Sequence, residues 1–303
     1  MEEPRGFCFP GLRWFLAVQL DLETALDAHL DVQDASLLVD GDLGYVTLTV
    51  EFGCRWMRPR LKDEAGLGYL PNSMYHHGFA MLGLSEAYGA VDESLLWQEG
   101  AAGRRRSIGE ALKLAVKLAV TSQEKNQWGG WRYTPTSTDA DTSVTGAMLM
   151  GLLAARNAGI EVPDQTITKA LEYMQRSTGK DGSVAYSGGM GGMGESMNRS
   201  AIATLVMSVG RHKDWEQFKA ALKHITGLLE HRESSYPEYY RYYMAQALFQ
   251  GDYEAWQKWN AALVRQFHQT QNADGSFSNG SYGTGMSLLA LALNFRFLPI
   301  YER

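Results

Sequence analysis

The sequence has 303 residues, of which 45% are hydrophobic, so the chain is long enough to bury a large core. Lys and Arg number 28 against 34 Asp and Glu, and the net charge of −6 argues against a nucleic-acid surface, which needs a basic stripe. The two cysteines, Cys8 and Cys54, are too few for a disulfide scaffold or a zinc site of several thiolates, and leave room for one bridge.

The first seventy residues are the least regular part of the sequence. The apolar stretch over residues 11–20 is interrupted by Arg13 and is too short to cross a bilayer, so we expect no transmembrane segment and favour a cytoplasmic location. One or two helices are expected here, although residues 40–50 would also suit a strand. We expect a single domain over 1–303, with the elements of residues 1–70 left open.

Two kinds of predicted helix alternate after this region. Helices that are apolar or small on nearly every side are expected to be buried all round and to form an inner layer. These inner helices are expected at residues 74–88, 143–155, 198–209, 239–249 and 284–294. Helices with one apolar stripe and one charged face are expected to form an outer layer. These outer helices are expected at residues 108–123, 165–176, 215–229 and 256–267.

The connections between the layers repeat as well. Three outer helices end at a Gln, at positions 123, 175 and 271, and each leads into a turn that contains glycine. Glycine permits the positive φ that reverses a chain after a helix. Since one helix pair cannot cover its own apolar face, successive pairs must stack, and the pattern predicts an all-α toroid (α/α barrel) of about 10–12 paired inner and outer helices.

These Gln-to-aromatic turns resemble degenerate forms of the QW motif of squalene cyclases. The stretches that begin at Met74 (MYHHGFA), Gly129 (GGWRYTP) and Asp141 (DTSVTG) are similar to bacterial proteins with prenyltransferase and squalene oxidase repeats. The resemblance covers the chain from about residue 66 onward. It implies a toroid with a central cavity and does not by itself name a reaction. Our leading hypothesis is a small apolar or isoprenoid-type ligand in that cavity, with acid-initiated cyclisation as the candidate activity and no cofactor.

The candidate acids come from the same resemblance. Squalene-hopene cyclases carry Asp-x-Asp-Asp-Thr at the head of an inner helix, and here Asp141 matches the Asp before Thr142 while Ala140 stands in place of the middle Asp. Asp139 and Asp141 are therefore the candidate acids, because protonating an alkene needs a strong acid supported by neighbouring carboxyl groups. The structural alternative makes Asp141 the N-cap of the helix and places Asp139 near its positive end.

Three further charged or titratable residues are expected near this end of the toroid. His76 is a candidate general base or a hydrogen-bonded structural histidine. Glu195 follows the glycine-rich run 188–194, which predicts a loop over the cavity mouth, and it is a further candidate acid. Arg199 is a candidate cation for an anionic substrate group, or a partner of Glu195 four residues earlier.

No metal site is expected. The adjacent His76 and His77 would diverge by roughly 100° on a helix and make a poor metal pair. The Asp, Cys and His that bind zinc in protein prenyltransferases cannot be placed, so zinc-dependent prenylation is not expected.

Aromatic residues gather where the inner helices begin. The face of an aromatic ring can stabilise a cation or stack on a sugar or lipid. Aromatic residues at helix ends can also serve only to pack neighbouring helices. The candidate ligand-binding residues are Trp131, Tyr133, Tyr239, Tyr240, Tyr243 and Tyr282. Tyr75 and Tyr186 fall in the same turns.

Two other functions stay open. A carbohydrate-active (α/α) barrel enzyme would use paired carboxylates, and a separation above about 10 Å between Glu195 and Asp139 or Asp141 would weigh against it. A non-catalytic repeat scaffold or binding module would be favoured by a cavity filled with its own side chains.

Overall fold

A computed structural model describes residues 68–70, 73–88, 107–188, 196–273, 275–277 and 280–293. Within these ranges the regular elements are helices, apart from two isolated β-bridges, and the predicted all-α fold is confirmed. The helices are α3 (Met74–Ala87), α4 (Ile108–Gln123), α5 (Thr142–Asn157), α6 (Asp164–Ser177), α7 (Met197–Val209), α8 (Glu216–Thr226), α9 (Pro237–Gly251), α10 (Tyr253–Thr270) and α11 (Gly280–Ala292).

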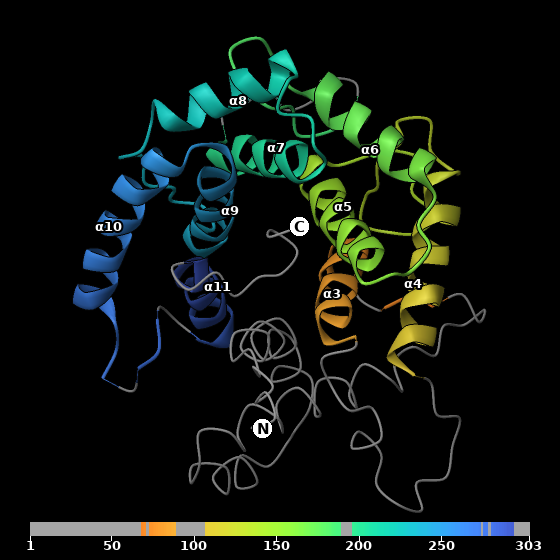
Figure 1. Ribbon diagram of the computed structural model, residues 1–303, viewed down its shortest axis with the longest axis horizontal. Helices are drawn as coiled ribbons and strands as arrows, with labels where there is room; N and C mark the ends of the chain where they lie inside the picture. The colour runs from red at the N-terminus through yellow and green to blue at the C-terminus, as the bar shows by residue number, and fades with distance from the viewer. Residues whose placement is uncertain are drawn as a thin grey trace, which may run out of the picture.

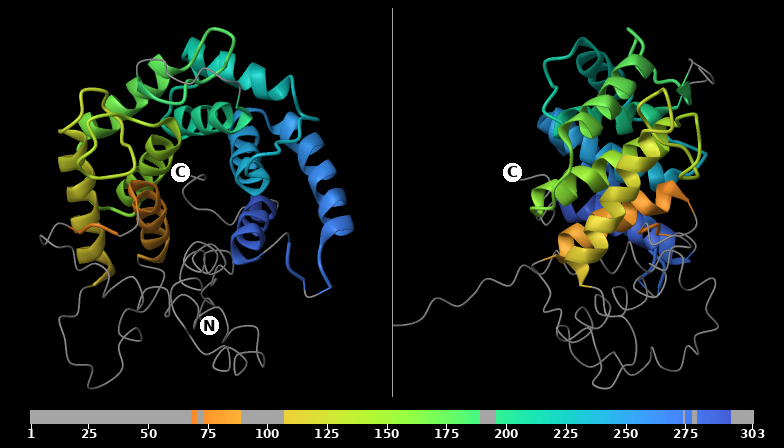
Figure 2. Two further views of the ribbon diagram at one scale, coloured as in Figure 1. Left: turned by 180° about the vertical axis from the view of Figure 1, so that it is seen from behind. Right: turned by 90° about the vertical axis from the view of Figure 1, so that its right-hand side faces the viewer.

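The helices form two concentric layers that curve into an arc (Figures 1 and 2). The inner layer holds α3, α5, α7, α9 and α11, each packed on the next, and α4, α6, α8 and α10 cover it from outside. The sequence predicted this alternation, and the burial pattern explains it. Nearly every residue of α5 is buried, whereas α6 buries a stripe that includes Ile167, Leu171 and Met174 and exposes Lys169 and Glu172.

The inner helices α3 and α5 approach each other closely through two glycines. A Cβ added to Gly151 would lie 2.4 Å from the carbonyl oxygen of Gly78, and one added to Gly78 would lie 2.6 Å from the backbone of Ala147. No side chain fits at such separations, so the two helices pack backbone to backbone at this crossing.

The predicted glycine turns after the outer helices are confirmed. The turn glycines Gly129, Gly182 and Gly275 have φ values of +79°, +84° and +84°. The side-chain amide of Gln123 donates to the carbonyl of its turn glycine at 2.6 Å, and that of Gln271 does so at 2.9 Å. Gln175 departs from this pattern and donates to Gln217 at 3.4 Å. Gln recurs at two of these helix ends because its amide closes the turn that follows.

Backbone hydrogen bonds link the heads of successive inner helices at one end of the arc. The N–H of Met74, at the start of α3, donates to the carbonyl of Tyr133 in the segment before α5. The N–H of Thr142, at the start of α5, donates to the carbonyl of Tyr186 in the segment before α7. The loops that carry the candidate acids and aromatics therefore share this end.

Several sequence predictions fall outside the described residues. These are the helices or strand expected within residues 1–67, the pairing of Cys8 with Cys54, and the placement of Glu195. None of the described helices is both long and apolar enough to cross a membrane.

Candidate functional site

The segment that carries the candidate acids is fixed to the core by Trp131. The indole N–H of Trp131 donates to the carbonyl of Ala119 at 2.9 Å and to the hydroxyl of Ser122 at 3.0 Å. Its backbone N–H donates to the hydroxyl of Thr145, and its carbonyl accepts from the N–H of Asp141 at 2.8 Å. With 2% of its surface exposed, Trp131 is a core residue, and its role as a ligand contact stays a prediction.

One carboxylate oxygen of Asp141 caps the N-terminus of helix α5. Its Oδ1 accepts the N–H of Val144 at 2.9 Å, which confirms the predicted N-cap of α5. The residue is fully buried, and its Oδ2 has no hydrogen-bond partner within the described part of the chain. Burial raises the pKa of the Asp141 carboxyl above its usual 3.8, and its interactions with Val144 and Tyr186 partly offset this rise.

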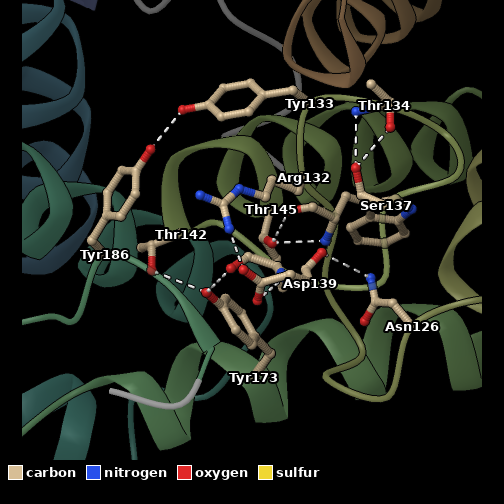
Figure 3. A network of polar contacts seen from close by, with 12 residues as sticks. Asn126, Arg132, Tyr133, Thr134, Ser137, Asp139, Thr142, Thr145, Tyr173 and Tyr186 are labelled. Atoms are coloured by element: carbon tan, nitrogen blue, oxygen red, sulfur yellow. Dashed lines mark hydrogen bonds and ion pairs between the residues drawn. The ribbon is translucent and has the colours of Figure 1, made fainter. Parts of the chain in front are cut away.

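Asp139 lies two residues before Asp141 and is more exposed to solvent. Its side chain is 38% exposed and forms an ion pair with the guanidinium of Arg132 (Figure 3). Its Oδ1 also accepts the N–H of Ala140 at 2.7 Å. Arg132 interacts electrostatically with both carboxyl groups, so the two acids and this arginine form one charged group in different surroundings.

Two tyrosines and a second arginine complete what we call the α5-head site, namely Arg132, Tyr133, Asp139, Asp141, Tyr186 and Arg199. The hydroxyls of Tyr133 and Tyr186 lie 2.7 Å apart, as Figure 3 shows. The guanidinium carbons of Arg132 and Arg199 each lie 6.0 Å from the ring centre of Tyr186, within the range of cation–π attraction. Arg199 also donates from Nε to the carbonyl of Val184 at 2.8 Å.

His76 has a local partner at the start of α3. Its Nδ1 lies 2.8 Å from the hydroxyl of Ser73, and the ring is partly buried. This contact matches the structural alternative for His76, and its role as a general base stays a prediction.

The predicted tyrosines of α9 and α11 are divided between two places. Tyr239 and Tyr243 pack with their ring centres 4.7 Å apart, and Tyr75 of α3 lies 5.9 Å from Tyr239. Tyr282 interacts electrostatically with this cluster, and burial raises its pKa to about 12. Tyr240 instead lines a pocket between α9 and α10.

Four residues of the α5-head site are predicted from the sequence, whereas two are not. The predicted ones are Asp139, Asp141, Tyr133 and Arg199, and the others are Arg132 and Tyr186. Arg132 meets Asp139 only because the chain reverses between them through hydrogen-bonded turns, such as that from Ser137 to Thr134. The pairing of Tyr186 with Tyr133 joins residues 53 positions apart. Neither contact could be predicted from the spacing of these residues in the sequence.

Known proteins resemble this chain in fold but not in sequence. No protein-family model matches the chain, and no curated protein matches it. The GH76A α-1,6-mannanase of Salegentibacter sp. HEL1_6 superposes with a TM-score of 0.58 at 10% identity, over 96% of this chain and 91% of that one. A GH76 α-mannanase of Bacteroides thetaiotaomicron gives 0.54 at 11% identity, over 96% and 87%. The fold is that of an α/α toroid.

The comparison corrects the family resemblance drawn from the sequence. Three solved structures that match 94–96% of the chain are family 76 glycoside hydrolases, so the predicted kinship with squalene-cyclase-like and prenyltransferase proteins is wrong. An inactive variant of the Salegentibacter enzyme, with a TM-score of 0.54 at 10% identity over 96% of this chain and 91% of that one, was solved with α-1,6-mannotetrose. That ligand gives no support to the isoprenoid-type ligand predicted from the sequence.

Proposed function

We propose that this protein is a glycoside hydrolase that cleaves an oligo- or polysaccharide at the α5-head site. One observation carries the proposal: a buried carboxyl group with an unpartnered oxygen, that of Asp141, lies beside a more exposed, ion-paired carboxylate, that of Asp139. Glycoside hydrolysis uses such a pair, one acid that protonates the leaving oxygen and one carboxylate that acts as base or nucleophile.

The surroundings of the two acids support a different role for each. Because burial raises the pKa of Asp141, this carboxyl group keeps its proton to higher pH and is the general acid, with Oδ2 as the oxygen that the helix cap leaves unused. Asp139, held by Arg132, is the carboxylate that activates water or attacks the sugar. Tyr133, 45% exposed, offers an aromatic face for the sugar ring.

The fold comparison supports glycoside hydrolysis as the reaction class, but it does not identify the substrate. The inactive Salegentibacter variant has two adjacent aspartates replaced. This chain contains no two adjacent aspartates, and in its described part the pattern nearest to that pair is Asp139 and Asp141 on either side of Ala140. We therefore propose that this protein hydrolyses a glycosidic bond with Asp139 and Asp141, and we do not extend the proposal to the α-1,6-mannan linkage.

The test compares Asp141→Asn and Asp139→Asn with the wild type on a panel of polysaccharides, measured by the release of reducing ends. Asn is a good N-cap, so Asp141→Asn should fold normally while kcat falls by about 100-fold or more. Asp164→Asn is the matched control, because the Asp164 side chain, in the first turn of α6, is 92% exposed. Hydrolysis that persists in both site variants, or no hydrolysis of any glycan by the wild type, would contradict the proposal.

A non-catalytic glycan-binding module is the second candidate, and one observation favours it. Rings from α3 and α9, which are not neighbours in the inner layer, meet inside the arc: Tyr75 contacts Tyr239, and Phe79 contacts Tyr242, each at 5.9 Å. Side chains thus fill part of the interior. Calorimetric binding of an oligosaccharide that is recovered intact would favour this function.

A further inference from the structure

A pocket lies between α9 and α10, beneath the connection that leads into α9. Its volume is about 550 Å³, within the roughly 300–1,000 Å³ typical of small-molecule sites. The two helices stand side by side in Figure 1, and the pocket is lined from both of them. None of the residues of the α5-head site lines it.

Two arginines of like charge line this α9–α10 pocket. Burial lowers the pKa of Arg241, the nearby Glu238 carboxylate opposes this, and the neighbouring Arg232 lowers the pKa by a smaller amount. Arg232 donates to the neutral amide of Gln266 at 3.2 Å, and Arg241 lies over the ring of Phe267 at 5.5 Å. Neither guanidinium forms an ion pair with a carboxylate of the described residues, so an anion between them would relieve their repulsion.

Two acidic residues of the connection, Glu230 and Glu233, also line the pocket. Glu233 accepts the backbone N–H groups of Ser234 and Ser235 at 3.1 and 3.3 Å, and its other oxygen lies 3.7 Å from His231. Glu230 is exposed. Glu233 therefore has its hydrogen-bond and ion-pair partners within the connection itself.

Two aromatic residues complete the lining of the pocket. The hydroxyl of Tyr240 is buried without a hydrogen-bond partner in the described structure, and only 4% of this pocket-lining residue is exposed. Trp259, from α10, supplies an aromatic surface.

We propose that the α9–α10 pocket binds a small organic anion: a carboxylate or phosphate ester carried on a body the size of a sugar ring. Arg241 and Arg232 hold the anionic group, the hydroxyl of Tyr240 donates to it, and Trp259 packs against the ring. This site is separate from the acids of the α5-head site, so it stands whether or not the protein hydrolyses glycans.

Isothermal titration of the full chain tests the proposal, with glucuronate, glucose 6-phosphate, inorganic phosphate and uncharged glucose as probes. We expect at least one of the two sugar anions to bind, and glucose to give no measurable heat. In Arg241→Gln the affinity for that sugar anion should fall by about tenfold or more, as expected when a charge-assisted hydrogen bond is lost. Tyr240→Phe, which keeps the ring, should weaken binding by a smaller factor.

Matched variants keep the result decisive. Arg265→Gln removes an exposed arginine of α10 that does not line the pocket, and it should bind like the wild type. If Arg241→Gln fails to fold, Arg232→Gln takes its place, because Arg232 is exposed. Equal binding of glucose, binding unchanged by either pocket arginine, or inorganic phosphate as tight as the sugar phosphate would overturn the proposal. Loss of binding in Asp141→Asn instead would move the ligand to the α5-head site.

Discussion

His77 makes the stability of the inner layer depend on pH. It is fully buried in α3, its Nδ1 accepts the N–H of Leu70 at 3.1 Å, and its Nε2 lies 3.0 Å from the carbonyl of Ala115. These partners require a neutral ring that carries its proton on Nε2, because a second proton on Nδ1 would face another donor. Burial lowers the pKa of His77 from 6.5 to about 4, and the Ala115 carbonyl partly opposes this.

The sign and size of the effect follow from that shift. Since the pKa is lower in the folded protein, the unfolded chain takes up the proton first as the pH falls. The stabilisation is therefore complete above pH 6.5 and is lost progressively between pH 6.5 and about 4. At about 1.4 kcal/mol per pH unit, the loss is roughly 3 kcal/mol.

Urea unfolding of the wild type and His77→Gln across this range isolates the contribution, because other titrating groups are common to both proteins. We expect the wild type to be more stable at about pH 7, and its advantage over the variant to shrink by roughly 3 kcal/mol at about pH 4. A difference in unfolding free energy that stays constant across the range would refute the proposed burial of a neutral histidine.

Three other predictions concern stability and are measured by the same urea titration. Trp131→Phe removes the indole N–H that two buried groups accept, and it should cost about 1–3 kcal/mol. Gly182→Ala should cost about 2 kcal/mol or more, since φ is +84° and the new Cβ would lie 2.3 Å from the carbonyl oxygen of Ala220; Gly159→Ala, with φ of +87° and open space, should cost clearly less. Ser107→Ala breaks the capping box of α4 and should cost about 1 kcal/mol.

The helices and turns were predictable because local physics fixes them. A segment such as α5, apolar on nearly every side, can only lie between other elements, and α6 with one charged face can only cover them. The cap role of Asp141 also follows from local chemistry, since a short acidic side chain before a helix meets free N–H groups.

The family and the composition of the site were not predictable to the same degree. The recurring Gln followed by a glycine turn resembles a family signature, yet the hydrogen bond from Gln123 to Gly129 shows that this Gln stabilises the turn at the end of an outer helix. A hydrogen bond of this kind can form in any α/α toroid, so it does not distinguish one enzyme family from another. The contact of Arg132 with Asp139 depends on how a loop reverses, and that is tertiary information.

The carboxylate of Asp141 gives one oxygen to the helix and leaves the other without a partner. Asn can keep the first of these arrangements while removing the acid, and the codons for Asp and Asn differ by a single base. Under the proposed function, one point mutation would therefore convert the hydrolase into a protein of the same stability and shape that binds its glycan without cleaving it. Such a variant could accumulate in a population without being removed as misfolded, and a lectin-like lineage could begin from it.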